Sequence, residues 1–189
     1  MKQSVKFLTL ILLSAVTIFI SSCDKKTEEV PEGTNNKEFS WRPELKISDI
    51  PDTPVKSSIG GIEVQIKYIN FEQWRGSGDN VLNFGDIVPK NDCGYVEDDN
   101  SFHLIHKSGE LKAGELLKVA FDKNLDGYSG YYESSKDGDQ ESKKSIPWNC
   151  ALVITEIGEI TIKGKIAMCF KDDKKSWIAG TFEAIRCSN

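Results

Sequence analysis

Residues 150–186 read CALVITEIGEITIKGKIAMCFKDDKKSWIAGTFEAIR, and this stretch decides the fold. Three segments in it are rich in apolar and β-branched residues: Cys150 to Thr155, Glu159 to Phe170 and Trp177 to Arg186. Turn-forming residues separate them, at Ile157-Gly158 and at Asp172 to Lys175. The pattern predicts an antiparallel meander of three strands at the end of the chain. Gly164, in the middle segment, predicts a bulge or a close approach of another part of the chain.

The segments before the meander also have strand patterns. Apolar and polar residues alternate strictly over Ile62–Tyr68, which is typical of a half-buried strand. Weaker strand patterns follow at Val81–Phe84 and Phe102–His106, whereas Gly109–Phe121 combines helical spacing with glycines that favour a turn into a strand. Several short strands separated by turns predict an all-β, mostly antiparallel fold with little helix. Either a β-sandwich or an open barrel that ends in the meander would satisfy this pattern.

The first 23 residues have the pattern of an export signal. Two lysines precede an apolar run over Phe7–Ile20, which is too short to span a membrane, and two serines and a cysteine follow it. The segment Ile20-Ser21-Ser22-Cys23 resembles the lipobox of bacterial lipoproteins. This resemblance implies removal of residues 1–22, lipidation of Cys23 and a membrane anchor in the bacterial cell envelope. The alternative is an ordinary cleaved signal that leaves Cys23 as a thiol.

A polar segment follows this cysteine. Residues 23–58 contain many charged side chains, several prolines and only scattered apolar residues, so we expect the lipidated cysteine to be followed by a flexible tether. We expect a single β-rich globular domain over residues 59–189. The charged run Asp24–Glu29 is similar to sorting signals that direct some Gram-negative lipoproteins to the outer membrane or the cell surface. A linker that is merely soluble is the alternative.

The charge of the chain argues against nucleic acid as a partner. The 189 residues include 24 basic and 29 acidic side chains, which give a net charge of −5. Removal of the leader, which holds two lysines and no acids, would leave −7. An acidic surface repels phosphate backbones. The expected partners are therefore the membrane, through the anchor, and a glycan or protein ligand that the sequence does not identify.

Four cysteines remain when Cys23 is set aside: Cys93, Cys150, Cys169 and Cys187. An even number in an exported chain predicts two disulfides, and free buried thiols are the alternative. If the last turn of the meander centres between Asp173 and Lys174, Cys169 lies opposite Ile178 and Cys187 lies nine residues further along, at about 30 Å. Cys169–Cys187 is therefore the least expected pair. Both remaining connectivities join Cys93 to the meander.

One segment matches the template of a calcium-binding loop. The match to D-x-[DN]-x-[DN]-G-x5-E comprises Asp122, Asn124, Asp126, Gly127 and Glu133. By analogy, the carbonyl of Tyr128 would be a further ligand. The polar residues after Glu133 cannot supply the exit helix of an EF-hand, so two interpretations stay open: a stand-alone calcium-binding turn and a solvated turn without metal. No other cofactor is expected.

Two histidines and three tyrosines are further candidates for a site. His103 and His106 lie three residues apart, so on a strand they face opposite sides and cannot chelate one metal ion. We interpret them as ordinary strand residues. Tyr128, Tyr131 and Tyr132 lie beside two glycines and predict an exposed aromatic surface that binds a glycan or a protein partner.

The sequence contains no strong catalytic motif. It lacks a G-x-S-x-G nucleophile elbow and a phosphate-binding loop, and a close carboxylate pair among 29 acids would carry no specificity. We therefore predict a domain that binds a glycan, a peptide or an envelope protein without catalysis. An inhibitor or immunity-type lipoprotein and a carboxylate-based hydrolase are the alternatives. The globular part resembles small β-sandwich lipoproteins of the envelope, but it has no motif that names a family.

Overall fold

The structure is a computed structural model, which describes residues 38–187 apart from 95, 97, 137 and 138. This described part consists mainly of strands, with one short 3-10 helix, η1 (Ile47–Asp49). The strands are β1 (Lys56–Ile59), β2 (Ile62–Val64), β3 (Tyr68–Gln73), β4 (Asn80–Gly85), β5 (Ser101–His106), β6 (Gly114–Lys118), β7 (Tyr128–Lys136), β8 (Asp139–Ser142), β9 (Trp148–Ile157), β10 (Thr161–Phe170) and β11 (Trp177–Arg186). None of the described residues belongs to a helix with the length and apolar character that a membrane crossing requires.

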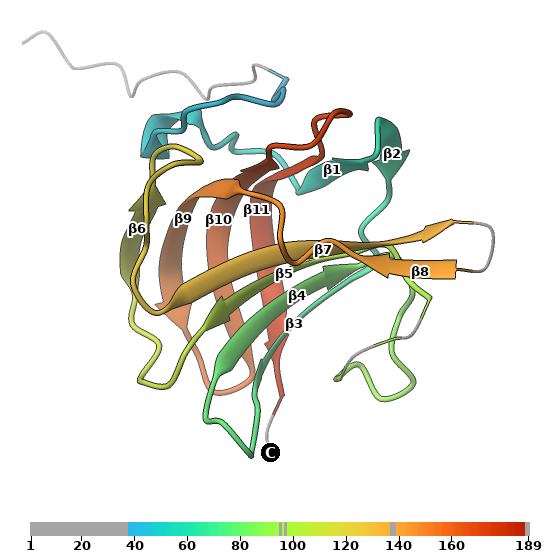
Figure 1. Cartoon of the computed structure of the whole chain (residues 1–189). Coiled ribbons are helices and arrows are strands. Elements are labelled where there is room, and N and C mark those ends of the chain that lie inside the picture. The colour runs from blue at the N-terminus through green and yellow to red at the C-terminus, as the bar shows by residue number, and fades with distance from the viewer. Residues whose placement is uncertain (1–37, 95, 97, 137–138, 188–189) are drawn as a thin grey trace, which may run out of the picture. The chain divides into compact units, whose positions relative to one another are not determined.

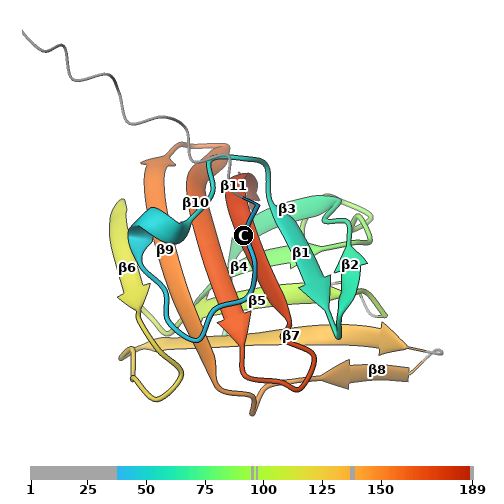
Figure 2. The same ribbon diagram turned by 90° about the horizontal axis from the view of Figure 1, so that it is seen from above.

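These strands belong to one sheet, which curls into a half-barrel (Figure 1). The strand order is β6-β9-β10-β11-β3-β4-β5-β7-β8, and a hairpin of β1 and β2 adds to β11. Pairing is antiparallel except between β11 and β3, where Ile185 lies beside Asn70 in parallel. Strands β9, β10 and β11 form one wall, and β4, β5 and β7 run across it (Figure 2). The predicted all-β, mostly antiparallel fold with little helix is confirmed.

The hydrophobic core fills the concave side of the curled sheet. Side chains alternate between the two faces of a strand, so Cys150 and Leu152 of β9 belong to the core while Ala151 faces outward. The two halves of the sheet meet through aromatic side chains. Phe84 of β4 packs edge-on against Phe182 of β11, with 5.5 Å between the ring centroids. One core therefore joins the crossing strands into a single unit.

The N-terminal strap, defined here as residues 38–50, packs on the outer face of β9–β11 (Figure 2). Leu45 and Ile50 of the strap are 0% and 2% exposed, and the Trp41 indole donates a hydrogen bond to the Phe170 carbonyl at 2.7 Å. The small residues beneath it are Ala151, Ala167 and Ala179. The expected tether boundary at residue 58 is therefore wrong, because a few apolar residues suffice to cover a face built from small side chains. Residues 23–37 lie outside the described part.

The predicted C-terminal meander is confirmed. Strand β10 pairs antiparallel with both β9 and β11, and Cys169 lies opposite Trp177, one residue from its expected position opposite Ile178. Gly164 marks a register shift between β9 and β10, and a Cβ added there would lie 2.3 Å from the Val153 carbonyl oxygen. The glycine thus serves both a bulge and a close approach of the neighbouring strand.

Other strands differ from the predictions. The alternating segment Ile62–Tyr68 is split, because β2 ends at Val64 and β3 begins at Tyr68. The ambiguous segment Gly109–Phe121 contains strand β6. Strands β7 and β8 were not predicted, since their residues are mostly serine, glycine and charged residues. Pairing of β7 with β5, from Tyr128 opposite His106 to Glu133 opposite Ser101, compensates for this weak local preference.

Candidate functional site

An apolar cavity of about 380 Å³ lies at one end of the half-barrel. Its walls come from strands β3 to β7 and β9 to β11, together with the loop that precedes β6. Apolar side chains dominate the lining, among them Phe71, Leu82, Leu104, Leu152, Ile162 and Phe182. A volume of this size lies at the lower end of the range for small-molecule sites, and the composition is typical of them.

The polar residues in the lining of this cavity are Asn80, His106, Glu110, Lys112 and Glu115. His106 lies on β5. Its imidazole stacks on the Tyr128 ring, with 4.4 Å between the centroids. Gly109 leaves room for the His106 ring, since a Cβ there would lie 3.3 Å from it, whereas a Cβ at Gly127 would make an ordinary contact at 3.7 Å. The Nδ1 atom of His106 is buried and has no hydrogen-bond partner. Such orphaned atoms are rare in native proteins.

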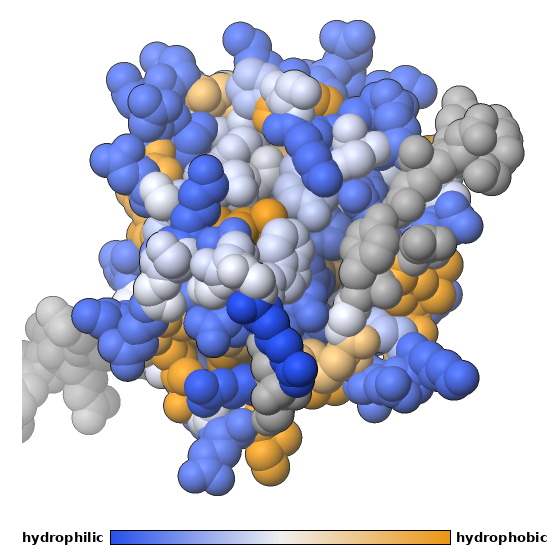
Figure 3. Space-filling model, turned by 60° about the horizontal axis from the view of Figure 1, so that its bottom comes forward, coloured by the Kyte–Doolittle hydropathy of each residue, from blue (hydrophilic) through white to orange (hydrophobic). Residues whose placement is uncertain are grey.

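A more polar hollow adjoins the cavity, and the two share part of their lining. This hollow has a volume of about 670 Å³, and the residues that it shares with the cavity lining are Phe71, Asn80, Glu110, Leu111 and Ile162. Glu159 and Arg186 are among the charged residues that line it. In Figure 3, where the bottom of Figure 1 is turned forward, hydrophobic surface shows between hydrophilic side chains. The cavity is therefore apolar within and ringed by charges of both signs.

A second hollow lies at the opposite ends of the same strands. Its volume is about 740 Å³, and it is bordered by the β1–β2 hairpin, the end of β7 and the turn between β10 and β11. Lys67, Lys143 and Asp173 are among the charged residues around it. The Tyr132 hydroxyl, also in its lining, donates a hydrogen bond to Asp172 at 2.7 Å. This wide, charged groove lacks the apolar enclosure of the first cavity.

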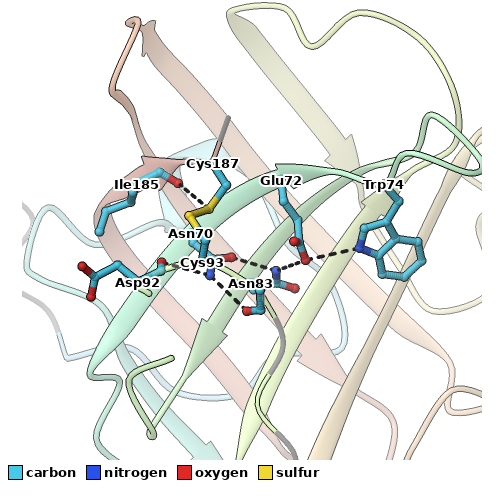
Figure 4. Close-up of a disulfide and its surroundings, with 9 residues drawn as sticks. Asn70, Glu72, Trp74, Asn83, Asp92, Cys93, Ile185 and Cys187 are labelled. Carbon is cyan, nitrogen blue, oxygen red and sulfur yellow. Dashed lines mark hydrogen bonds between the residues drawn. A yellow bond between two sulfur atoms is a disulfide. The ribbon is translucent and has the colours of Figure 1, made fainter. Parts of the chain in front are cut away.

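A layer of buried polar side chains covers the outer face of the second half of the sheet. Asn70, Asn83, His103 and Tyr131 lie side by side on β3, β4, β5 and β7, and all four are less than 8% exposed. The chain at residues 92–94 lies over the first of these strands. The Asn70 amide donates to the carbonyl oxygens of residues 92 and 94, at 3.4 and 3.2 Å (Figure 4). Hydrogen bonds between side chains stabilise this buried layer.

Ser101, His103 and Asn83 form a hydrogen-bonded chain within this layer. Ser101 Oγ lies 2.8 Å from His103 Nε2, and His103 Nδ1 lies 2.7 Å from Asn83 Oδ1. A serine, a histidine and an amide that orients it can also form a nucleophilic site. Asn83 lies 20 residues before His103, so the three residues do not form a recognisable sequence motif. Ser101 is 0% exposed, however, so the arrangement is structural. Burial, with a smaller contribution from Lys144, lowers the pKa of His103 to about 3 and keeps the ring neutral.

Asp99 is a second buried titratable group beside this layer. It is 0% exposed, and the Tyr68 hydroxyl donates a hydrogen bond to its Oδ2 at 2.9 Å. Burial raises the pKa of Asp99 to about 6, and it also raises the pKa of Tyr68 above its ordinary value. Gly85 makes the contact possible, because a Cβ there would lie 2.2 Å from the Tyr68 ring.

A disulfide joins Cys93, in the loop after β4, to Cys187, the residue after β11 (Figure 4). This is one of the links from Cys93 to the meander that the sequence left open. The second expected disulfide is absent, because Cys150 and Cys169 are free and buried. Cys150 lies opposite Met168, and both side chains face the core. Cys169 follows Met168 on β10, so its side chain faces the strap on the other side of the sheet. Burial raises the pKa of both thiols.

The predicted calcium ligands do not converge. Asp122, Asn124 and Asp126 are exposed in the turn before β7, whereas Glu133 is 4% exposed and lies opposite Ser101. Tyr128 and Glu133 are five residues apart on a strand, or about 17 Å, so Glu133 cannot close a loop around the turn. Within the described ranges, no group of three or more His, Cys, Asp or Glu residues is arranged to hold a metal ion. Calcium binding by the turn alone stays a prediction.

The three candidate tyrosines do not form one exposed surface. Tyr128 and Tyr132 face the concave side, Tyr131 faces outward, and Tyr131 and Tyr132 are 7% and 4% exposed. The histidines do face opposite sides, as predicted: His103 stacks on Tyr131 and His106 on Tyr128. The role of His106 in a cavity wall was missed. The strand alternation alone could have placed it inward, but the cavity depends on strands that are remote in sequence.

Comparison of the chain with known protein families, curated protein sequences and solved structures finds no match. The fold and the cavity define a structural class: a half-barrel whose concave side holds a ligand-sized apolar space at one end. The lipobox-like segment and Cys23 lie outside the described residues.

Proposed function

We propose that this protein is a lipid-anchored protein of the bacterial cell envelope whose domain binds a small ligand and catalyses no reaction. The apolar cavity of about 380 Å³ is the observation that supports binding most strongly. The lipobox-like segment that ends at Cys23 supports the anchor, and the charged run after it supports a location in the outer membrane or at the cell surface.

The chemistry of the cavity favours an apolar ligand over a glycan. A sugar ring carries hydroxyls that need hydrogen-bond partners, and the interior offers mainly aliphatic and aromatic side chains. Burial of apolar ligand surface contributes about 25 cal/mol per Å², so an enclosed apolar space favours such ligands. The lining contains one histidine and no serine or cysteine, which supports binding rather than nucleophilic catalysis.

Displacement of water by an apolar fluorescent dye tests the cavity. The whole chain carrying Cys23→Ala, which removes the acylation site, can be titrated with N-phenyl-1-naphthylamine in detergent-free buffer. Leu116→Trp adds bulk to the cavity lining, whereas Leu117→Trp places the same side chain at a neighbouring position that is 39% exposed. We expect Leu116→Trp to weaken dye binding at least tenfold and Leu117→Trp to leave it unchanged. Equal binding by both variants would refute a ligand site in the cavity.

Metabolic labelling tests the anchor independently. We expect a fatty-acid analogue to label the wild-type chain and to leave the Cys23→Ala variant unlabelled. Protease treatment of intact cells then distinguishes display on the cell surface from anchoring in a leaflet that faces the cell interior or the periplasm. Absence of label on the wild-type chain would remove the basis for the envelope assignment.

A further inference from the structure

We infer that the second hollow is a separate binding site for a neutral carbohydrate of about two sugar rings. This groove is lined by the segment between Ile59 and Lys67, by β7 and the loop after β8, and by the turn between β10 and β11 (Figure 1). Its volume of about 740 Å³ corresponds to roughly 25 water-sized groups at about 30 Å³ each, and a disaccharide has about 23 carbon and oxygen atoms. The proposed function concerns the apolar cavity and does not depend on this site.

Side chains that form hydrogen bonds dominate the lining of the groove. Amide, hydroxyl and carboxylate groups come from Gln65, Asn100, Ser134 and Asp172, among others. Each hydroxyl of a sugar both donates and accepts a hydrogen bond, and it loses its bonds to water when it is enclosed. The groove offers partners for such hydroxyls, whereas the apolar cavity does not.

Hydrogen bonds within the protein hold the carboxylates of the groove in place. Asp86 accepts hydrogen bonds from the backbone N–H and the side-chain amide of Asn100, at 2.9 and 2.8 Å. Asp172 accepts hydrogen bonds from the Tyr132 hydroxyl at 2.7 Å and from the Ser176 backbone N–H at 2.8 Å. A carboxylate has about four acceptor positions, so both groups can also accept from a ligand hydroxyl. Because these side chains are already oriented, binding costs less conformational entropy.

The charges of the groove favour a neutral ligand. Its ammonium groups belong to Lys67, Lys143 and Lys174. Its carboxylates belong to Glu63, Asp86, Asp172 and Asp173. An ionic ligand would meet repulsion as well as attraction in this lining, whereas a hydroxyl can accept from an ammonium group and donate to a carboxylate.

The groove also contains apolar surface. Ile62 follows the turn of the β1–β2 hairpin and is 71% exposed, and Ile146 lies in the loop after β8. A sugar ring has a face of C–H groups as well as its hydroxyls, and contact with an aliphatic side chain removes that face from water. The lining therefore provides both kinds of contact that a sugar ring makes.

Saturation-transfer difference NMR with maltose, cellobiose and lactose tests the groove on the whole Cys23→Ala chain. We expect at least one of these neutral disaccharides to bind with a dissociation constant of about 1 mM or below. Asp173→Ala removes an exposed carboxylate of the lining, and we expect it to weaken binding about tenfold, the contribution of one hydrogen bond to a charged group. Asp126→Ala makes the same change of charge in the exposed turn before β7, outside the lining, and should leave binding unchanged.

A pair of tryptophan variants tests the location by bulk instead of charge. Ser134 lies two residues after Tyr132 on β7 and therefore points to the same side of the strand. We expect Ser134→Trp to weaken disaccharide binding at least tenfold. Ser142→Trp, at an exposed position of β8 outside the lining, should leave it unchanged. Circular dichroism checks that each variant is folded, and Asp173→Ala tests the groove without added bulk.

Three results would overturn the inference. The first is that none of the disaccharides binds at about 10 mM, or that binding is the same in Asp173→Ala and Asp126→Ala. The second is tighter binding of glucuronate or glucosamine than of glucose, which would exclude a neutral ligand. The third is displacement of N-phenyl-1-naphthylamine by a disaccharide, which would place the sugar in the apolar cavity. Loss of dye binding in Leu116→Trp concerns the proposed function alone, so the two proposals can fail separately.

Discussion

His103 and Asp99 should have opposite effects on the pH dependence of stability. The pKa of His103 is lowered to about 3 in the fold, from about 6.5, and that of Asp99 is raised to about 6, from about 4. Between pH 4 and 6 the unfolded chain therefore binds more protons at His103, and the folded chain binds more at Asp99. Stability due to His103 is lost as the pH falls through this window, and stability due to Asp99 is lost as the pH rises through it.

The magnitudes nearly cancel in the wild type. One proton changes the free energy of unfolding by 1.36 kcal/mol per pH unit at most, so each group contributes about 2 kcal/mol between pH 4 and 6. Asp99→Asn leaves His103 uncompensated, and we expect its free energy of unfolding to rise by about 2 kcal/mol over this range relative to the wild type. His103→Gln should show the reverse change: relative to the wild type, its free energy of unfolding should fall by about 2 kcal/mol from pH 4 to pH 6.

Urea denaturation at pH 4, 5 and 6, followed by tryptophan fluorescence, measures these differences. The double variant serves as the control, because it should regain the pH dependence of the wild type even if it is less stable at every pH. Glu133 lies 3.9 Å from His103 Nε2 and would favour a protonated ring. If the Glu133 carboxylate outweighs burial, the change with pH in the free energy of unfolding of His103→Gln, relative to the wild type, will have the opposite sign.

If the free energies of unfolding of both single variants differ from that of the wild type by the same amount at every pH, the assignment of both groups is refuted.

Three further predictions concern the fold. Joint replacement of Cys93 and Cys187 by alanine opens a loop that spans 94 residues, and we expect it to lower the free energy of unfolding by about 4.6 kcal/mol, measured by urea denaturation without reductant; a change below about 1 kcal/mol would contradict this. Leu45→Ala should lower stability by about 2–5 kcal/mol, because the side chain is 0% exposed; no change would mean that the strap is not part of the folded unit. Gly164→Ala should lower the melting temperature through overpacking worth about 1–3 kcal/mol, since the added Cβ meets the Val153 carbonyl; an unchanged melting temperature would speak against the bulge.

Local alternation predicts the strands that carry the core. The pattern of Cys150–Arg186 defined three strands, and the turn at Asp172 to Lys175 set their register to within one residue. Which cysteines pair depends on the face of the sheet that each one occupies as well as on the number of cysteines. Cys150 and Cys169 face opposite sides of one sheet, which follows from the β9–β10 pairing and not from the number of cysteines.

Long-range packing decides the rest. The apolar residues of the strap are too sparse to predict burial, yet Leu45 and Ile50 are buried because alanines on β9–β11 leave a shallow face for them. Strand β7 has weak local preference and forms through its pairing with β5. The cavity needs strands from β3 to β11 at once, so no segment of the sequence could reveal that His106 would line it.

The disulfide also determines how the protein would respond to a pulling force. Cys93 and Cys187 close a covalent ring that includes β5 to β11, so a load applied between the N-terminal side and residue 187 cannot extend the chain inside that ring. Among the described residues, only 38–93 can then be extended, which corresponds to at most about 200 Å of contour length. Reduction of the disulfide would release the ring and add about 300 Å of extensible chain. A domain tethered at its N-terminus would thus yield its strap and first strands under tension while most of the cavity wall stays within the ring.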